Sequence, residues 1–280
     1  MAIFKAIMIG DVVGDPGLLA LETQLPGLIK EHSADFVVVN GENAAEGFGL
    51  TEACLKRILA AGADVVTGGN HIWEKRDFWP VLDSEPRVLR PGNYPAGTPG
   101  RGWAVFEKPQ TESGAPVSWC VVNLQGRKFM TAIDCPFRYF DSLREALEGA
   151  GQNAMPQSAP PRPVILVDFH AEATEEKEAL GYYLDGRASV IAGTHTHVQT
   201  ADERILPKGT AYITDLGMTG VTDSVIGMDR KVCLDRVRKQ VLFRMECAQP
   251  GPDGQGSVVQ GIAAEIDGDT GKALSIMRLG

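Results

Sequence analysis

The sequence predicts an α/β fold in which a largely parallel, buried sheet carries a binding site at one edge. The first third of the chain alternates short β-branched runs with segments of helical spacing, which is typical of strand-helix-strand units. Several expected strands run straight into a polar residue, at the end where open α/β sheets place their ligands. With 280 residues, of which 44% are hydrophobic and 22% charged, the chain can bury a sizeable core and is not expected to be disordered.

The expected elements of the first third are three strands and two helices. The strands cover residues 6–9, 36–39 and 64–66, which are short apolar runs. Apolar residues at helical spacing extend over 18–30 and 52–61. Thr51 is placed to cap the second helix, whereas Pro26 argues against an unbroken first helix.

The rest of the chain predicts further strands at 103–107, 117–123, 164–168, 189–192 and 211–214, with a helix at 140–148 that Gly149 and Gly151 would end. Residues 232–243 fit a helix or a strand, and 258–266 with 273–279 predict an antiparallel hairpin. The four prolines of 149–163 indicate a surface loop. Because the motifs described below lie on both sides of this loop and need each other in space, we predict a single domain over residues 1–280.

The composition limits the partners and the compartment of the protein. With 27 Lys and Arg residues against 36 Asp and Glu residues, its net charge of −9 argues against stable DNA binding and against attraction to an anionic membrane. The first ten residues hold no basic leader, and no run of about 18 apolar residues occurs, so we expect a cytoplasmic protein without a membrane segment. The five dispersed cysteines form no CxxC pair and are expected to be reduced thiols.

Four of the five histidines lie in segments that follow expected strands, beside carboxylate and amide side chains. They are His71, His170, His195 and His197, and their carboxylate and amide neighbours are Asp11, Glu42, Asn43 and Asn70. A lone histidine at a strand end is usually structural, but this joint placement favours a metal site, and the mixed nitrogen and oxygen donors suit iron, manganese or zinc. His195 and His197 are two apart on an expected extended segment, so their rings would point the same way and reach two neighbouring ions.

Five ordered motifs resemble those of the bacterial YmdB-like branch of the calcineurin-like dinuclear metallophosphoesterases. They are Gly10-Asp11-Val12-Val13-Gly14, Asn40-Gly41-Glu42-Asn43, Gly69-Asn70-His71, Asp168-Phe169-His170-Ala171-Glu172 and Gly193-Thr194-His195-Thr196-His197. The resemblance implies an α/β sandwich of two packed mixed sheets flanked by helices, and a phosphodiesterase that hydrolyses cyclic nucleotides, above all 2′,3′-cyclic nucleoside monophosphates. A small-molecule cyclic nucleotide is therefore the expected partner, and the sequence leaves the formation of a homo-oligomer open.

The resemblance also implies two metal ions per chain, with iron expected first and manganese or zinc as alternatives. Their ligands would be Asp11, Glu42, Asn43 and His197 for one ion, and Glu42 as a bridge with Asn70, His170 and His195 for the other. The wider superfamily has a histidine where this chain has Val13, which cannot bind a metal. Asn43 would take the place of that missing imidazole or stabilise a bound water.

Two adjacent cations would lower the pKa of a bridging water enough to supply hydroxide near neutral pH, and would neutralise the phosphate oxygens. His71 follows the ligand Asn70 directly, so we expect it at the rim of the site as the general acid that protonates the leaving ribose oxygen. The alternative for His71 is a supporting hydrogen bond to a carboxylate.

Other functions fit the sequence less well. A dinucleotide-binding oxidoreductase would need G-x-G-x-x-G spacing, which the glycines after the first strand lack. A mononuclear zinc amidohydrolase would have its His-x-His pair on an early strand, whereas His195 and His197 come late. A regulator of RNA processing that binds metal and nucleotide with little or no turnover stays open, because a ligand set indicates metal binding more surely than catalytic rate.

Overall fold

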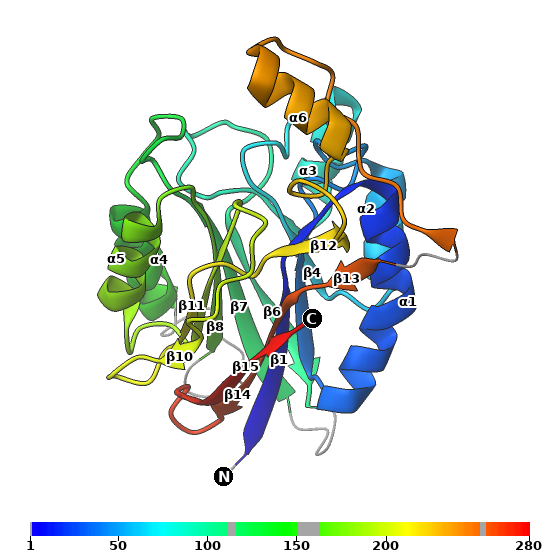
Figure 1. Cartoon of the computed structure of the whole chain (residues 1–280). Coiled ribbons are helices and arrows are strands. Elements are labelled where there is room, and N and C mark those ends of the chain that lie inside the picture. Colours follow the sequence, from blue (N-terminus) through cyan, green and yellow to red (C-terminus); the bar gives the residue numbers. More distant parts are fainter. Residues whose placement is uncertain (1, 111–115, 151–162, 253–255) are drawn as a thin grey trace.

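The computed structural model describes residues 2–110, 116–150, 163–252 and 256–280. Two six-stranded mixed sheets pack face to face, and helices cover their outer faces (Figure 1). This architecture confirms the predicted sandwich of two mixed sheets flanked by helices. No helix in the described ranges is long and apolar enough to cross a bilayer.

The first sheet has the strand order β15-β14-β1-β3-β4-β5 and takes strands from both ends of the chain. Its strands are β1 (Ile3–Ile9), β3 (Phe36–Asn40), β4 (Val65–Thr67), β5 (Val88–Leu89), β14 (Gly261–Asp267) and β15 (Ala273–Leu279). The four strands from β1 to β5 run parallel, and β14 and β15 add the antiparallel edge. The predicted hairpin near the end of the chain is thus present, but its first strand begins only at Gly261.

The second sheet has the order β10-β11-β9-β8-β7-β6. Its strands are β6 (Trp103–Pro109), β7 (Pro116–Gln125), β8 (Val164–His170), β9 (Val190–Thr194), β10 (Arg204–Ile205) and β11 (Ala211–Ile213). A small third sheet joins β2 (Asp11–Val12), β12 (Met218–Val221) and β13 (Ser257–Val259). The parallel pairing of β2 with β12 fixes the backbone of Asp11 opposite Met218.

The strands are buried on both faces, which explains their unbroken apolar runs. In β1, Ala6 and Met8 belong to the core between the two sheets, whereas Ile7 and Ile9 belong to the core beneath the helices. Between the sheets, the rings of Phe36 and Trp119 stack with their centroids 4.9 Å apart. This rigid double layer holds the carboxyl ends of the strands in place.

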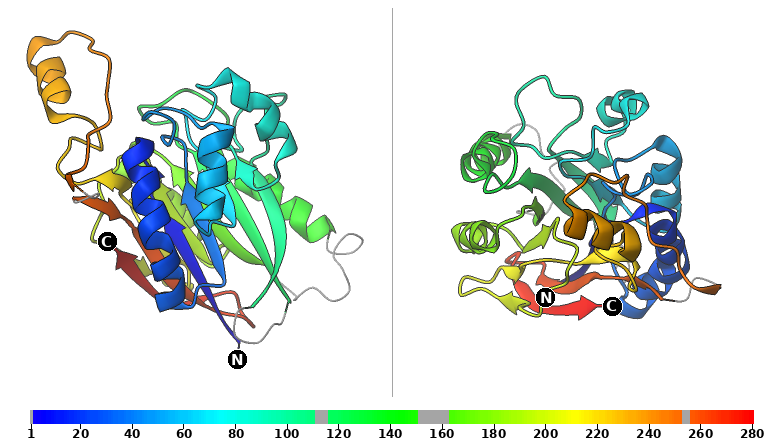
Figure 2. Two further views of the ribbon diagram at one scale, coloured as in Figure 1. Left: turned by 90° about the vertical axis from the view of Figure 1, so that its right-hand side faces the viewer. Right: turned by 45° about the horizontal axis from the view of Figure 1, so that its top comes forward.

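Most of the helices form the outer layers (Figure 2). Their bounds are α1 (Gly14–His32), α2 (Glu52–Ala60), α3 (Trp79–Ser84), α4 (Pro136–Ala150), α5 (Thr174–Leu184) and α6 (Arg230–Lys239), with a short 3-10 turn at Arg76–Phe78. Apolar residues of α1 and α2 pack on the first sheet, and those of α4 and α5 pack on the second. The hydroxyl of Thr51 caps α2 as predicted, accepting a hydrogen bond from the Cys54 N–H.

Several predicted boundaries were wrong. Helix α1 begins at Gly14 and continues through Pro26, because that proline is exposed and water can bond the carbonyl that loses its partner. Helix α4 begins at Pro136, at the first helical position that suits proline, and extends past Gly149. The ambiguous stretch 232–243 contributes to α6, and 258–266 divides between β13 and β14. The proline-rich stretch expected as a loop lies mostly outside the described residues, and the single-domain organisation stays a prediction.

Candidate metal centre

The polar residues singled out in the sequence follow strands of both sheets and gather at the carboxyl ends of the parallel strands. Asp11 lies in β2 directly after β1, Glu42 follows β3 and Asn70 follows β4. His170 is the last residue of β8, and His195 comes directly after β9. Parallel strands end at a common edge, so separate segments of the chain supply one site.

Four donor atoms converge around the imidazole of His170. Its Nε2 atom lies 2.9 Å from Glu42 Oε1, 3.0 Å from His195 Nδ1 and 3.1 Å from Asn70 Oδ1. The Glu42 and His170 side chains are buried. A carboxylate, an amide oxygen and two ring nitrogens directed at one point form a mixed nitrogen and oxygen donor set that fits a transition-metal cation.

A buried hydrogen-bond relay sets the tautomer of His170. The Thr194 hydroxyl donates to Asp168 Oδ1 at 2.7 Å, so its oxygen accepts from the His170 Nδ1–H at 2.9 Å. Asp168 in turn accepts hydrogen bonds from Asn40 and Thr67. With Nδ1 carrying the proton, the lone pair of Nε2 faces the donor cluster.

Asp11 and His197 form the neighbouring half of the site. The Asp11 Oδ1 atom is fully buried and has no hydrogen-bond partner among the described residues, and it lies 4.0 Å from His197 Nε2. The His197 Nδ1–H donates to the Ile226 carbonyl at 2.9 Å, which leaves Nε2 facing Asp11 and the Asn43 amide at 3.1 Å. An orphaned carboxylate oxygen beside an imidazole lone pair fits a second cation.

A buried ion pair fixes the segment that carries His195 and His197. Asp215 accepts hydrogen bonds from the N–H and hydroxyl of Thr196, and Lys177 contacts it at 2.6 Å. The two histidines have φ angles of 99° and 64°, in the left-handed region that such residues rarely adopt. The expected extended conformation was therefore wrong, because β9 ends at Thr194; the rings reach the two halves through a strained turn instead.

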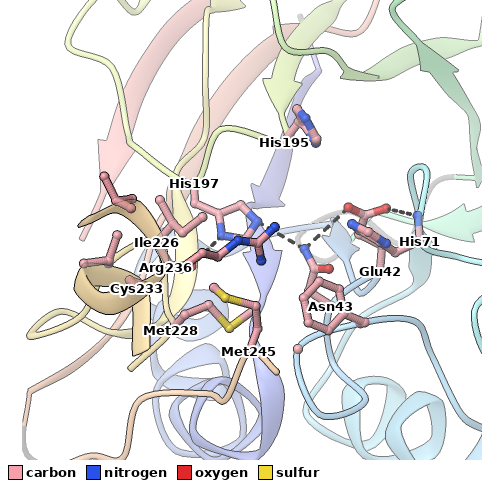
Figure 3. Close-up of a pocket in the computed structure, with 14 residues that line it drawn as sticks. Glu42, Asn43, His71, His195, His197, Ile226, Met228, Cys233, Arg236 and Met245 are labelled. Atoms are coloured by element: carbon pink, nitrogen blue, oxygen red, sulfur yellow. Dashed lines mark hydrogen bonds between the residues drawn. The ribbon is translucent and has the colours of Figure 1, made fainter. Parts of the chain in front are cut away.

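A cavity of about 370 Å³ opens directly beside the donor cluster (Figure 3). Glu42, Asn43, His195 and His197 line its floor, and mainly apolar side chains, among them Phe48, Ile226, Met228 and Met245, form its walls. An apolar cavity next to a polar centre is the usual form of a small-molecule site.

His71 lines this cavity without joining the donor atoms. Its backbone N–H donates to Glu42 Oε2 at 3.0 Å, its Nδ1 lies 3.3 Å from Glu74 Oε1, and its ring meets the Phe48 ring edge-on. The Nε2 atom has no hydrogen-bond partner within the described parts of the chain. The imidazole is therefore free to meet a ligand in the cavity.

Comparison with known proteins settles the family. A family model described as YmdB-like protein matches residues 7–279. The chain belongs to the YmdB-like family. A Bacillus subtilis relative of this YmdB-like protein, a 2′,3′-cyclic-nucleotide 2′-phosphodiesterase, is 43% identical over 98% of this chain and 96% of the relative.

Two solved structures share the fold. A hypothetical protein from Thermus thermophilus matches with a TM-score of 0.81, 39% identity and 98% coverage of both chains. A novel phosphatase from Mycoplasma pneumoniae matches with a TM-score of 0.82 and 31% identity, over all of this chain and 93% of the other. These matches confirm the predicted family and, with the Bacillus relative, the prediction that this YmdB-like protein is a phosphoesterase enzyme.

Burial and mutual charge shift the pKa values of the cluster strongly. Burial opposes the ionisation of Glu42, but the charge and hydrogen bond of His170 outweigh burial and bring the Glu42 pKa to about 2. Burial disfavours a charged His170, yet Glu42 and Asp11 raise its pKa to about 9. Burial raises the pKa of Asp11 to about 6, and burial together with the His170 charge lowers that of His195 to about 3. In the metal-free protein, the raised pKa favours a second proton on His170, which a cation bound at Nε2 would displace.

We expect the metal-free protein to lose thermal stability as the pH rises from 6.5 towards about 9. The pKa of His170 is raised from 6.5 to about 9 in the folded state, so its contribution to stability is complete below 6.5 and is lost as the pH rises through the folded value. Melting temperatures measured with a chelator present, at pH values from 6.5 to about 9, test the direction of this change in stability. A metal-loaded sample lacks this proton and serves as the control, and a metal-free melting temperature that increases over the interval would contradict the expectation.

Thr194→Val is expected to weaken metal binding by about 10- to 100-fold, because it removes the acceptor that holds the His170 tautomer while preserving the shape of the side chain. Metal affinity measured by competition with a chelator tests this effect. Thr210→Val is a matched control, since the buried Thr210 hydroxyl bonds the Gly186 N–H and the Ala188 carbonyl and none of the candidate ligands. Equal metal affinities of the wild type and Thr194→Val would show that the hydrogen-bond relay does not support metal binding.

The sequence missed two groups of residues. Asp168 appeared there only as part of a motif, although its position two before His170 on one strand places both on the same face. The cavity walls come from apolar residues far apart in the chain, with no motif to connect them.

Glu172, two residues after His170, contacts another candidate ligand. Its Oε2 atom lies 3.1 Å from His195 Nε2, so it orients the His195 ring from the outer side.

Proposed function

We propose that this YmdB-like protein is a dinuclear phosphodiesterase that hydrolyses cyclic nucleotides, principally 2′,3′-cyclic nucleoside monophosphates. The observation that carries the proposal is the cluster around His170 Nε2, where three other donor atoms lie within 3.1 Å at the floor of an apolar cavity. The cavity can receive a base and ribose while the phosphate lies against the donor cluster. The name of the Bacillus relative supports the choice of substrate.

Glu42 would bridge two ions, with iron as the first expectation and manganese or zinc as alternatives. Asn70, His170 and His195 would complete the ligands of one ion, and Asp11, Asn43 and His197 those of the other. When bound, the ions supply Lewis acidity that activates a water and neutralises the phosphate oxygens. The Asn43 amide nitrogen faces His197 and Glu42, and a half-turn of the amide would present its oxygen instead.

His71 would act as the general acid. The oxygen of the attacking water bonds to phosphorus and one of its protons passes to solvent. The bond from phosphorus to one ribose oxygen breaks, and His71 gives that oxygen its proton and regains one from solvent. The product is a nucleoside monophosphate in which the ribose oxygen released from phosphorus is a free hydroxyl. The position of His71 beside the cavity, with its Nε2 unpaired by the described residues, supports this role.

Turnover of the four 2′,3′-cyclic nucleoside monophosphates, with 3′,5′-cyclic nucleotides for comparison, tests the proposal. The protein is first stripped of metal, then loaded separately with iron, manganese and zinc, and its metal content is measured. We expect hydrolysis that requires about two ions per chain. Nucleotide binding without turnover for all three metals would overturn the proposal in favour of a regulatory role.

A further inference from the structure

Helix α6 forms one wall of the cavity and stands away from the two sheets (Figures 1 and 2). Cys233, Arg236 and Val237 of this helix line the cavity, and their i, i+3, i+4 spacing places them on one face. Figure 3 shows the Arg236 side chain extending from α6 across the cavity toward Asn43 and His197. A guanidinium group therefore faces the candidate metal centre from the side opposite the sheets.

The Arg236 guanidinium has no hydrogen bond or ion pair to any described residue, although the Glu42 carboxylate lines the same cavity. Both carboxylate oxygens of Glu42 are already paired, one with His170 and the other with the His71 N–H. The Asp11 carboxylate is fully buried. Among the described residues that line the cavity, Arg236 alone carries a fixed positive charge. In a protein with a net charge of −9, an unpaired guanidinium beside such a floor is suited to an anion that comes from outside.

We propose that Arg236 is a catalytic residue. From the cavity wall formed by α6, which faces the metal ligands, it would bind the phosphoryl oxygens of the substrate. This inference rests on the proposed function. A guanidinium presents two N–H donors in the geometry that phosphate oxygens accept. The phosphoryl group of a diester gains negative charge as the water oxygen adds, so this contact strengthens in the transition state.

Removing Arg236 should have one effect if this residue binds phosphate and another if it recognises the base. A residue that binds phosphate acts on every phosphodiester, whereas a residue that reads the base acts only on nucleotides. Glycerol 1,2-cyclic phosphate has the same five-membered cyclic diester without base or ribose, so it separates the two roles. Arg238 lies two residues further along the same helix, is exposed and does not line the cavity, which makes Arg238→Met the matched control.

We expect Arg236→Met to lower kcat/KM by about 10²-fold on a 2′,3′-cyclic nucleotide and on glycerol 1,2-cyclic phosphate alike, with kcat reduced and metal content unchanged. Arg236→Lys should restore part of the loss, and Arg238→Met should stay within about threefold of the wild type. Calorimetric titration with inorganic phosphate gives a reading that does not depend on turnover. Its Kd should rise about 10-fold or more in Arg236→Met.

Unchanged kcat/KM and phosphate affinity in Arg236→Met would overturn the inference. A loss confined to the nucleotide would overturn it too, because Arg236 would then act on the base. If the wild type hydrolyses neither diester, the proposed function fails, while phosphate titration of the two proteins still decides whether Arg236 binds the anion. Circular dichroism checks the fold of each variant, and the exposed position of the side chain makes misfolding unexpected.

Discussion

Glu42→Gln is expected to remove metal from both halves of the centre and to lower phosphodiesterase turnover by about 10³-fold or more. The Glu42 carboxylate is buried, contacts His170 and accepts hydrogen bonds from Asn43 and from the His71 N–H. Glutamine keeps the size of the side chain but removes the charge that would offset two cations. Elemental analysis and turnover of the same preparation measure the two effects together.

Glu172→Gln is the matched control, since it removes another carboxylate that contacts a candidate ligand, His195, but from an exposed position. Its expected cost is about 10- to 100-fold, the usual range for a group that only orients a ligand. Full metal content and near wild-type turnover in Glu42→Gln would exclude Glu42 as the bridge. Equal losses in the two variants would show that charge near the site, rather than bridging, matters.

The parallel strands could be predicted closely because burial on both faces leaves a clear signal in a short run. Strand β3 covers Phe36–Asn40 against an expected 36–39, and all five of its residues are buried. The change of sheet after β13 could not be predicted, because it depends on a tertiary contact. Gln260 lies between β13 and β14, and its side chain accepts a hydrogen bond from the Met218 N–H. No periodicity in the sequence encodes that contact.

The candidate ligands could be found because each follows a strand, and parallel strands bring their carboxyl ends together. The backbone of His195 and His197 could not be predicted in the same way. Their positive φ angles are maintained by hydrogen bonds from Thr196 to Asp215, a residue about twenty positions later that is itself paired with Lys177. Arg236 was missed because its importance comes from where α6 lies, which no local pattern shows.

His71→Ala is expected to lower turnover of a 2′,3′-cyclic nucleotide by about 10²- to 10⁴-fold while leaving metal content unchanged. The imidazole lines the cavity but lies outside the donor cluster, and only its backbone N–H contacts the candidate bridge Glu42. His32→Ala is the matched control, because His32 is the one histidine of the chain that does not belong to the strand-end segments.

The leaving group distinguishes a general acid from a residue that only positions the substrate. A ribose oxygen needs a proton as it departs, whereas a p-nitrophenolate ion leaves readily without one. His71→Ala should therefore lose much less activity on bis(p-nitrophenyl) phosphate than on the cyclic nucleotide. A loss of equal size on both diesters would show that His71 acts through Glu42 or through the shape of the cavity, because neither of those roles depends on the basicity of the departing oxygen.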